Sequence, residues 1–151
     1  MMTMTEEELQ ELTAAYSKQI DEMISDDDNH DECRELYQKY MEVQEQLLAM
    51  DFDKYAGQVV DAYYTLKDIY FALGQWGLED VDEDEEAEKE IELLTKILDI
   101  HKKQAQKDAK YLKIVAEDYE EIGEVYEGIE NDKKAEEMYD RADKIRESIN
   151  G

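Results

Sequence analysis

Acidic side chains at regular spacing are the first feature of this sequence that points to ligand chemistry. Asp80, Asp82 and Asp84 alternate along the chain, as the first three ligands of an EF-hand calcium loop do. The match then fails at its two most informative positions. Glu85 stands where the loop requires glycine for its sharp turn, and Ile91 stands where it requires a bidentate glutamate. We therefore expect no dedicated calcium site in this segment.

The two histidines and the single cysteine offer little further chemistry. His30 falls in an acidic loop and His101 near a helix end, and neither has a second ligand at metal-binding spacing on an inward face. Cys33 excludes an internal disulfide and is typical of a small apolar residue within a helical pattern. A Cys–His catalytic pair would lack an orienting third group, and the sequence has no glycine-rich phosphate loop. We predict a protein that is not an enzyme, with no cofactor and no metal site.

The net charge restricts the possible partners. The chain of 151 residues has 43 acidic and 17 basic residues, which gives a formal net charge of −26 at pH 7. This charge repels a nucleic-acid backbone and an anionic membrane, so we expect neither as a partner. It favours a basic partner, and the alternative is an acidic surface that only faces solvent.

The start of the sequence and its hydropathy bear on the cellular compartment. Residues 1–8 become acidic at once and lack the basic start and apolar run of a secretory signal. No segment approaches the apolar length that crosses a membrane. These features predict a cytoplasmic protein.

Composition and periodicity favour helices along the whole chain. The sequence has no proline, six glycines and 42% hydrophobic residues, and apolar residues recur three and four positions apart. We predict six amphipathic helices, over about 5–24, 31–50, 54–73, 84–103, 108–128 and 133–148.

Capping residues set several of these boundaries. Thr5 and Glu8 predict a capping box at the start of the first helix, and Asp53 predicts the N-cap of the third. Gly74 is expected to end the third helix, and Asp108 to cap the fifth after a break near 104–108.

The longest irregular stretch, about 74–86, carries the single tryptophan. A loop of this length exceeds what a simple connection requires. Trp76 either covers the end of a helical hairpin or is an exposed anchor for a partner.

The last third of the chain carries a two-part motif. Its first half combines two aromatic residues with an aliphatic residue and a glycine, and its second half alternates small and aromatic residues. These residues are Tyr119, Ile122, Gly123 and Tyr126, followed by Ala135, Tyr139 and Ala142. The pattern resembles the tetratricopeptide repeat, a pair of antiparallel helices. Glu147 departs from the pattern, because the family often has proline there.

The motif recurs upstream in less regular form. It is clear in 116–149, divergent in 60–101 and weak in 6–50. In the divergent copy Lys67 replaces the glycine, and the connection between the two halves is eight residues longer than in the clear copy.

The resemblance implies an all-α fold built as a repeat array. We expect one domain, 1–151, of about six antiparallel helices in three stacked hairpins, over about 5–50, 54–103 and 108–149. A plain antiparallel helical bundle is the alternative.

The resemblance also implies a groove, lined by the first helix of each hairpin, that binds peptides. The residues opposite the packed stripe of these helices are Asp61, Tyr64, Asp68, Phe71, Glu117, Glu120, Glu124 and Glu127. Their acids would repel the C-terminal carboxylate that some family members bind. They favour a segment that carries lysine or arginine, with the two aromatic rings available for cation–π contact.

We therefore predict a non-enzymatic, adaptor-like or co-chaperone-like module that binds a basic or amphipathic protein segment. The alternative function is an acidic decoy that inhibits a nucleic-acid-binding protein. One basic cluster, Lys102, Lys103, Lys107, Lys110 and Lys113, either neutralises its acidic neighbours or contacts a second copy in a homodimer.

Overall fold

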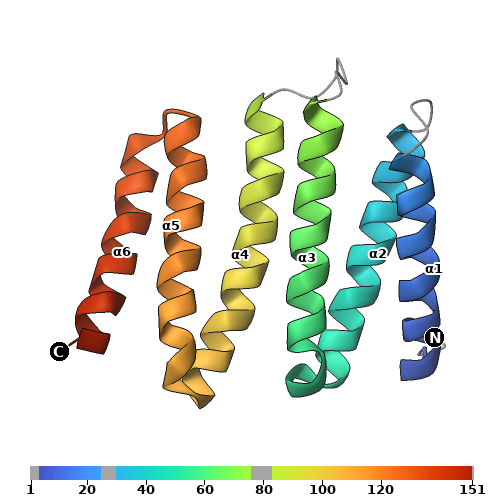
Figure 1. The fold of residues 1–151 in the computed structure, drawn as a ribbon, viewed down its shortest axis with the longest axis horizontal. Coiled ribbons are helices and arrows are strands. Elements are labelled where there is room, and N and C mark those ends of the chain that lie inside the picture. Colours follow the sequence, from blue (N-terminus) through green and yellow to red (C-terminus); the bar gives the residue numbers. More distant parts are fainter. Residues whose placement is uncertain (1–3, 25–29, 76–82, 151) are drawn as a thin grey trace. The chain divides into compact units, whose positions relative to one another are not determined.

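The computed structural model describes residues 4–24, 30–75 and 83–150, and the side chains of 23–34 and 69–86 lie outside this description. Within the described ranges every regular element is helical, which confirms the predicted all-α class with six α-helices (Figure 1). The elements are α1 (Glu6–Ile24), α2 (His30–Met50), α3 (Phe52–Gln75), α4 (Glu83–Lys107), the short 3-10 helix η1 (Ala109–Tyr111), α5 (Leu112–Gly128) and α6 (Asp132–Asn150). The loop that carries Trp76 lies outside the described residues.

The chain divides into two compact units, Met1–Trp76 with α1 to α3 and Gly77–Gly151 with α4 to α6. Within each unit, helices that follow one another in sequence pack side by side and antiparallel (Figure 1). The predicted middle hairpin, 54–103, joins α3 of one unit to α4 of the other. That hairpin and the single stacked domain remain predictions, since each unit is described by itself.

Side-chain caps begin both α1 and α3. The Glu8 amide donates to the Thr5 hydroxyl at 3.2 Å, and this hydroxyl donates to the Glu8 carboxylate at 3.0 Å, which confirms the cap of α1. The predicted N-cap Asp53 is wrong, because the Asp51 carboxylate accepts the hydrogen bond from the Lys54 amide at 3.2 Å. Phe52 and Asp53 therefore already belong to α3.

The end of α3 also differs from the prediction. The sequence predicts that Gly74 terminates the helix, but α3 continues through Gln75. Glycine lowers helix stability by only about 1 kcal/mol relative to alanine, which the last turn of a packed helix tolerates.

The junction between α4 and α5 is a true break. The helix α4 extends to Lys107, four residues beyond the predicted end. Asp108 has extended backbone with φ −146°, and its carboxylate accepts from the Lys110 amide at 3.1 Å. The break thus falls at Asp108, within the predicted range 104–108. Asp108 caps η1 and not α5 as predicted, because a 3-10 turn precedes α5, whose own N-cap Tyr111 makes no side-chain cap hydrogen bond.

A compact turn reverses the chain between α5 and α6. Glu130 adopts a left-handed backbone with φ 62°, and its amide donates to the Glu127 carbonyl at 3.0 Å. The Asn131 amide donates to the Tyr126 carbonyl at 2.9 Å, which completes a Schellman motif. The Asn131 side chain then accepts from the Lys134 amide at 3.3 Å and begins α6.

Side-chain links join the helices of the N-terminal unit. Glu6 of α1 accepts hydrogen bonds from Lys54 and Tyr55 of α3, and the Gln10 and Gln58 amides pair at 3.2 Å. The core between the helices is apolar, and its most buried side chains include Leu9, Leu47, Val59, Tyr63 and Leu66.

The C-terminal unit is held together on α5. Its buried residues Val115, Ala116, Tyr119 and Ile122 pack against α4 and α6. Gly123 permits a close approach of Tyr139 on α6, because a Cβ added there would lie 2.8 Å from Cε1 of the Tyr139 ring. The motif residues therefore set the packing that positions the other face of α5.

Candidate functional site

Four glutamates form a row on the side of α5 that faces away from its buried stripe. Glu117, Glu120, Glu124 and Glu127 follow one another three and four positions apart, so their side chains share one face of the helix. Glu117, Glu124 and Glu127 are exposed and Glu120 is half-buried. The structure thus places all four predicted residues of this helix along a single row.

Two of the four glutamates are fixed by α6. Glu120 forms an ion pair with Arg146, and the Glu127 carboxylate accepts a hydrogen bond from the Tyr139 hydroxyl at 2.6 Å. These contacts place the glutamate row beside α6 instead of on an isolated helix face. Glu117 and Glu124 make no ion pair with any residue that the structure describes.

The electrostatics at Tyr139 show how closely these acids are grouped. The hydrogen bond to Glu127 raises the pKa of the Tyr139 hydroxyl to about 12, with further contributions from burial and from the charges of Glu127 and Glu124. The hydroxyl therefore keeps its proton at neutral pH and remains a donor. Glu124 is close enough to act on the same group.

The helix α6 adds further acids to the same side. Tyr139 and Arg146 mark the side of α6 that faces the glutamate row. Exposed Glu136 and Asp143 lie next to these two residues at helical spacing, so they flank the row. We call Glu117, Glu120, Glu124, Glu127, Glu136 and Asp143 the acidic face.

The opposite side of α6 carries cations. The Arg141 guanidinium lies 5.8 Å from the ring centre of Tyr119, and the Lys134 ammonium lies 5.5 Å from that of Tyr126. The two sides of α6 thus differ in charge. The acidic face therefore reflects how the charged residues are arranged on α6, and not only the high acid content of the chain.

The predicted groove residues of α3 belong to the N-terminal unit. Asp61 and Asp68 are exposed and Tyr64 is half-buried, with the Lys67 ammonium 5.7 Å from its ring centre. The side chain of Phe71 lies outside the described residues. The structure aligns Asp61, Tyr64 and Asp68 along α3, and the joining of this row to the acidic face remains a prediction.

A buried His–Asp pair connects α4 to α5, and the sequence interpretation missed it. Nδ1 of His101 lies 2.5 Å from Oδ2 of Asp118, and the two residues are only 8% and 4% exposed. Burial raises the pKa of the Asp118 carboxyl, the hydrogen bond and charge of His101 oppose this, and Glu117 adds to it.

This pair could have been recognised from the sequence. His101 stands four residues after Ile97 and continues the inward stripe of α4, while Asp118 stands three residues after Val115 on α5. The prediction placed His101 near a helix end. The helix continues past it, so His101 has a packing role.

The basic cluster surrounds the junction of α4, η1 and α5. Its five lysines are all exposed, and Nζ of Lys110 lies 3.5 Å from Oδ2 of Asp108. Neutralisation of acidic neighbours and contact with a second copy remain the two interpretations.

Neither a metal centre nor a membrane span is found in the described ranges. Among these residues, no group of three or more His, Cys, Asp or Glu side chains is arranged to hold a metal ion. Within the same ranges, no helix combines the length and apolarity needed to cross a membrane. No protein-family model, curated protein or solved structure matches the chain.

Proposed function

We propose that this protein is a non-enzymatic helical interaction module, of the tetratricopeptide-like kind, that binds a basic or amphipathic protein segment. The observation that carries the proposal is the acidic face, where six carboxylates from two packed helices line one side of the α5–α6 pair. The motif resemblance supports it, because the family uses this helix to bind peptides. The proposed role is that of an adaptor or co-chaperone.

The contacts on α6 prepare this surface for a cationic partner. Glu120 and Glu127 are held in place by Arg146 and Tyr139, so they lose little side-chain freedom when a partner binds. Glu124, which lies between them, and Glu117, at the start of the row, stay exposed and are available to incoming lysine or arginine. A row of fixed and available carboxylates favours an extended or helical segment with several positive charges.

Binding to a defined peptide tests the proposal. The probe is a synthetic amphipathic peptide of lysine and leucine, with its glutamate-for-lysine counterpart as the negative control. We expect Glu117→Lys with Glu124→Lys to weaken binding of the basic peptide roughly tenfold or more, because two attractive charges become repulsive.

A matched variant separates the acidic face from total charge. Glu88 and Asp99 are exposed on α4, and Glu88→Lys with Asp99→Lys changes the net charge by the same amount. This variant should bind the basic peptide nearly as well as the unchanged protein. Equal weakening by both double variants would contradict the proposal and favour the acidic decoy, whose binding depends on overall charge.

A further inference from the structure

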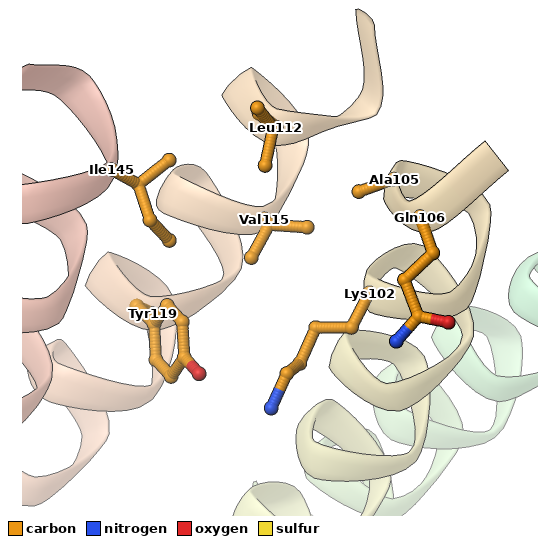
Figure 2. A pocket seen from close by; sticks show the side chains of 7 residues that line it. All are labelled: Lys102, Ala105, Gln106, Leu112, Val115, Tyr119 and Ile145. Carbon is orange, nitrogen blue, oxygen red and sulfur yellow. The ribbon is translucent and has the colours of Figure 1, made fainter. Parts of the chain in front are cut away.

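A pocket in the C-terminal unit opens on the side of α5 that carries Tyr119, away from the acidic face. It has a volume of about 270 Å³ and lies between the end of α4, the start of α5 and the last turns of α6. Its lining residues are Lys102, Ala105, Gln106, Leu112, Val115, Tyr119 and Ile145 (Figure 2).

The lining has an apolar part and a cationic part. Leu112, Val115 and Ile145 point into the pocket from α5 and α6 (Figure 2). Lys102 and Tyr119 add an ammonium and a hydroxyl to the lining, and both side chains lie at the lower side of the pocket in the view of Figure 2. Among the residues that the structure describes, none with a carboxylate side chain lines this pocket, although the chain as a whole has 43 acidic residues.

A second cation, Arg141, lies against Tyr119 of the pocket lining. The Arg141 guanidinium lies 5.8 Å from the ring centre of Tyr119. Lys102 is exposed, and its ammonium forms no ion pair or hydrogen bond within the described part of the chain. The pocket therefore presents an available positive charge next to an apolar wall, which is complementary to an amphipathic anion.

The volume limits the size of the occupant. A water molecule occupies about 30 Å³, so the pocket has room for roughly nine atoms of similar size. That is smaller than the space needed by a drug-sized ligand, which begins at about 300 Å³. A short acyl chain with one carboxylate fits both the volume and the charge.

We propose that this pocket binds a small aliphatic carboxylate of about the size of octanoate. The acyl chain lies among Leu112, Val115 and Ile145, and the carboxylate pairs with the Lys102 ammonium. The pocket and the acidic face lie on different sides of α5, so this binding is separate from that of a basic segment.

Methyl NMR of the full chain tests the proposal with octanoate as the probe and octanol as its uncharged analogue. Octanoate should shift the methyl signals of Leu112, Val115 and Ile145 and bind roughly fivefold tighter than octanol, as one exposed ion pair allows. Absence of these shifts, or equal affinity for both molecules, would overturn the proposal.

Two lysine variants locate the charge. Lys102→Met should remove the preference for octanoate over octanol, while Lys103→Met, an exposed neighbour outside the pocket lining, should retain it. Loss of the preference in both variants would show an unspecific charge effect and contradict the assignment. Methyl shifts caused by an acidic peptide but not by octanoate would likewise contradict it, in favour of a protein partner.

Discussion

At the scale of single residues, the His101–Asp118 pair shows how the protein accommodates ionisable groups in its interior. Nδ1 of His101 and Oδ2 of Asp118 are hydrogen-bonded at 2.5 Å, and both side chains are buried. A buried polar group without a partner costs about 1–3 kcal/mol, so each residue depends on the other.

We expect Asp118→Ala to lower the free energy of unfolding by about 1–3 kcal/mol, because Nδ1 of His101 stays buried without its partner. Asp118→Asn keeps a hydrogen-bonding group of the same shape and should cost less. Urea unfolding of both variants measures the difference. An alanine variant as stable as the unchanged protein would contradict the importance of the pair.

The pH dependence of this pair has a definite sign. Since burial raises the pKa of Asp118 above its ordinary value of 3.8, the folded protein holds this proton to a higher pH than the unfolded chain. The contribution of Asp118 to the free energy of unfolding therefore falls as pH rises from 3.8 through the raised pKa. Relative to Asp118→Asn, the unchanged protein should lose stability across this window in urea unfolding at several pH values. A relative gain would contradict the assignment.

Gly123 gives a second prediction at this scale. Alanine at this position would place its Cβ 2.8 Å from the Tyr139 ring, whose hydroxyl is held by Glu127. Overpacking of about 1–3 kcal/mol should exceed the gain of about 1 kcal/mol from alanine in a helix, so Gly123→Ala should be destabilising.

Gly57→Ala is the control for this substitution. Gly57 lies in α3, and a Cβ added to it would have no atom within 4 Å apart from its chain neighbours and the nearby backbone of its own helix, so the helix gain of about 1 kcal/mol should appear in full. Thermal unfolding of the two variants should shift in opposite directions. A shift of both to higher temperature would refute the close contact of α5 and α6.

At the scale of elements, the turn between α5 and α6 determines how the acidic face is assembled. Glu130 has a left-handed backbone at φ 62°, a conformation that costs about 1 kcal/mol for a residue with a side chain. Glu130→Gly should therefore stabilise the protein by about 1 kcal/mol.

The neighbouring cap provides the opposite case. Asn131→Ala removes the side-chain acceptor for the Lys134 amide and should cost about 1 kcal/mol. Chemical unfolding compares the two variants. If Glu130→Gly lowered the free energy of unfolding, the left-handed backbone conformation at position 130 would be contradicted.

The helices and caps were accessible from the sequence to different degrees. The apolar spacing placed the six helices, and Thr5 was recognised because a short polar side chain before a helix has a local role. Asp108 was recognised as a cap, but it caps η1 instead of α5. Residue type did not decide between Asp51 and Asp53, since aspartate is a good cap at either position. In the structure α3 begins two residues earlier than predicted, and Asp51 accepts from the Lys54 amide through its carboxylate and from the Tyr55 amide through its carbonyl.

The candidate site was predictable only in part. Periodicity placed Glu117, Glu120, Glu124 and Glu127 on one face, because that depends on one helix. The contacts with Arg146 and Tyr139, the His101–Asp118 pair and the pocket each join different helices. Sequence spacing within one helix carries no information on which residues of its neighbour it meets.

At the scale of the whole molecule, the net charge of −26 acts on stability as well as on partner choice. Like charges repel one another in the compact state, and added salt screens this repulsion. We expect the midpoint of thermal unfolding to rise from low to physiological sodium chloride. A lower midpoint would mean that attractive ion pairs outweigh the repulsion.

Because the whole chain is acidic, the place where a basic partner binds distinguishes the two proposed functions. An acidic decoy would contact a basic partner through many carboxylates along the chain, whereas an interaction module uses one face. Amide NMR of the full chain, titrated with the basic amphipathic peptide, distinguishes them most directly. We predict shifts concentrated on α5 and α6 around Glu117, Glu124 and Glu136. Shifts of similar size spread over the acidic residues of all helices would contradict the central claim.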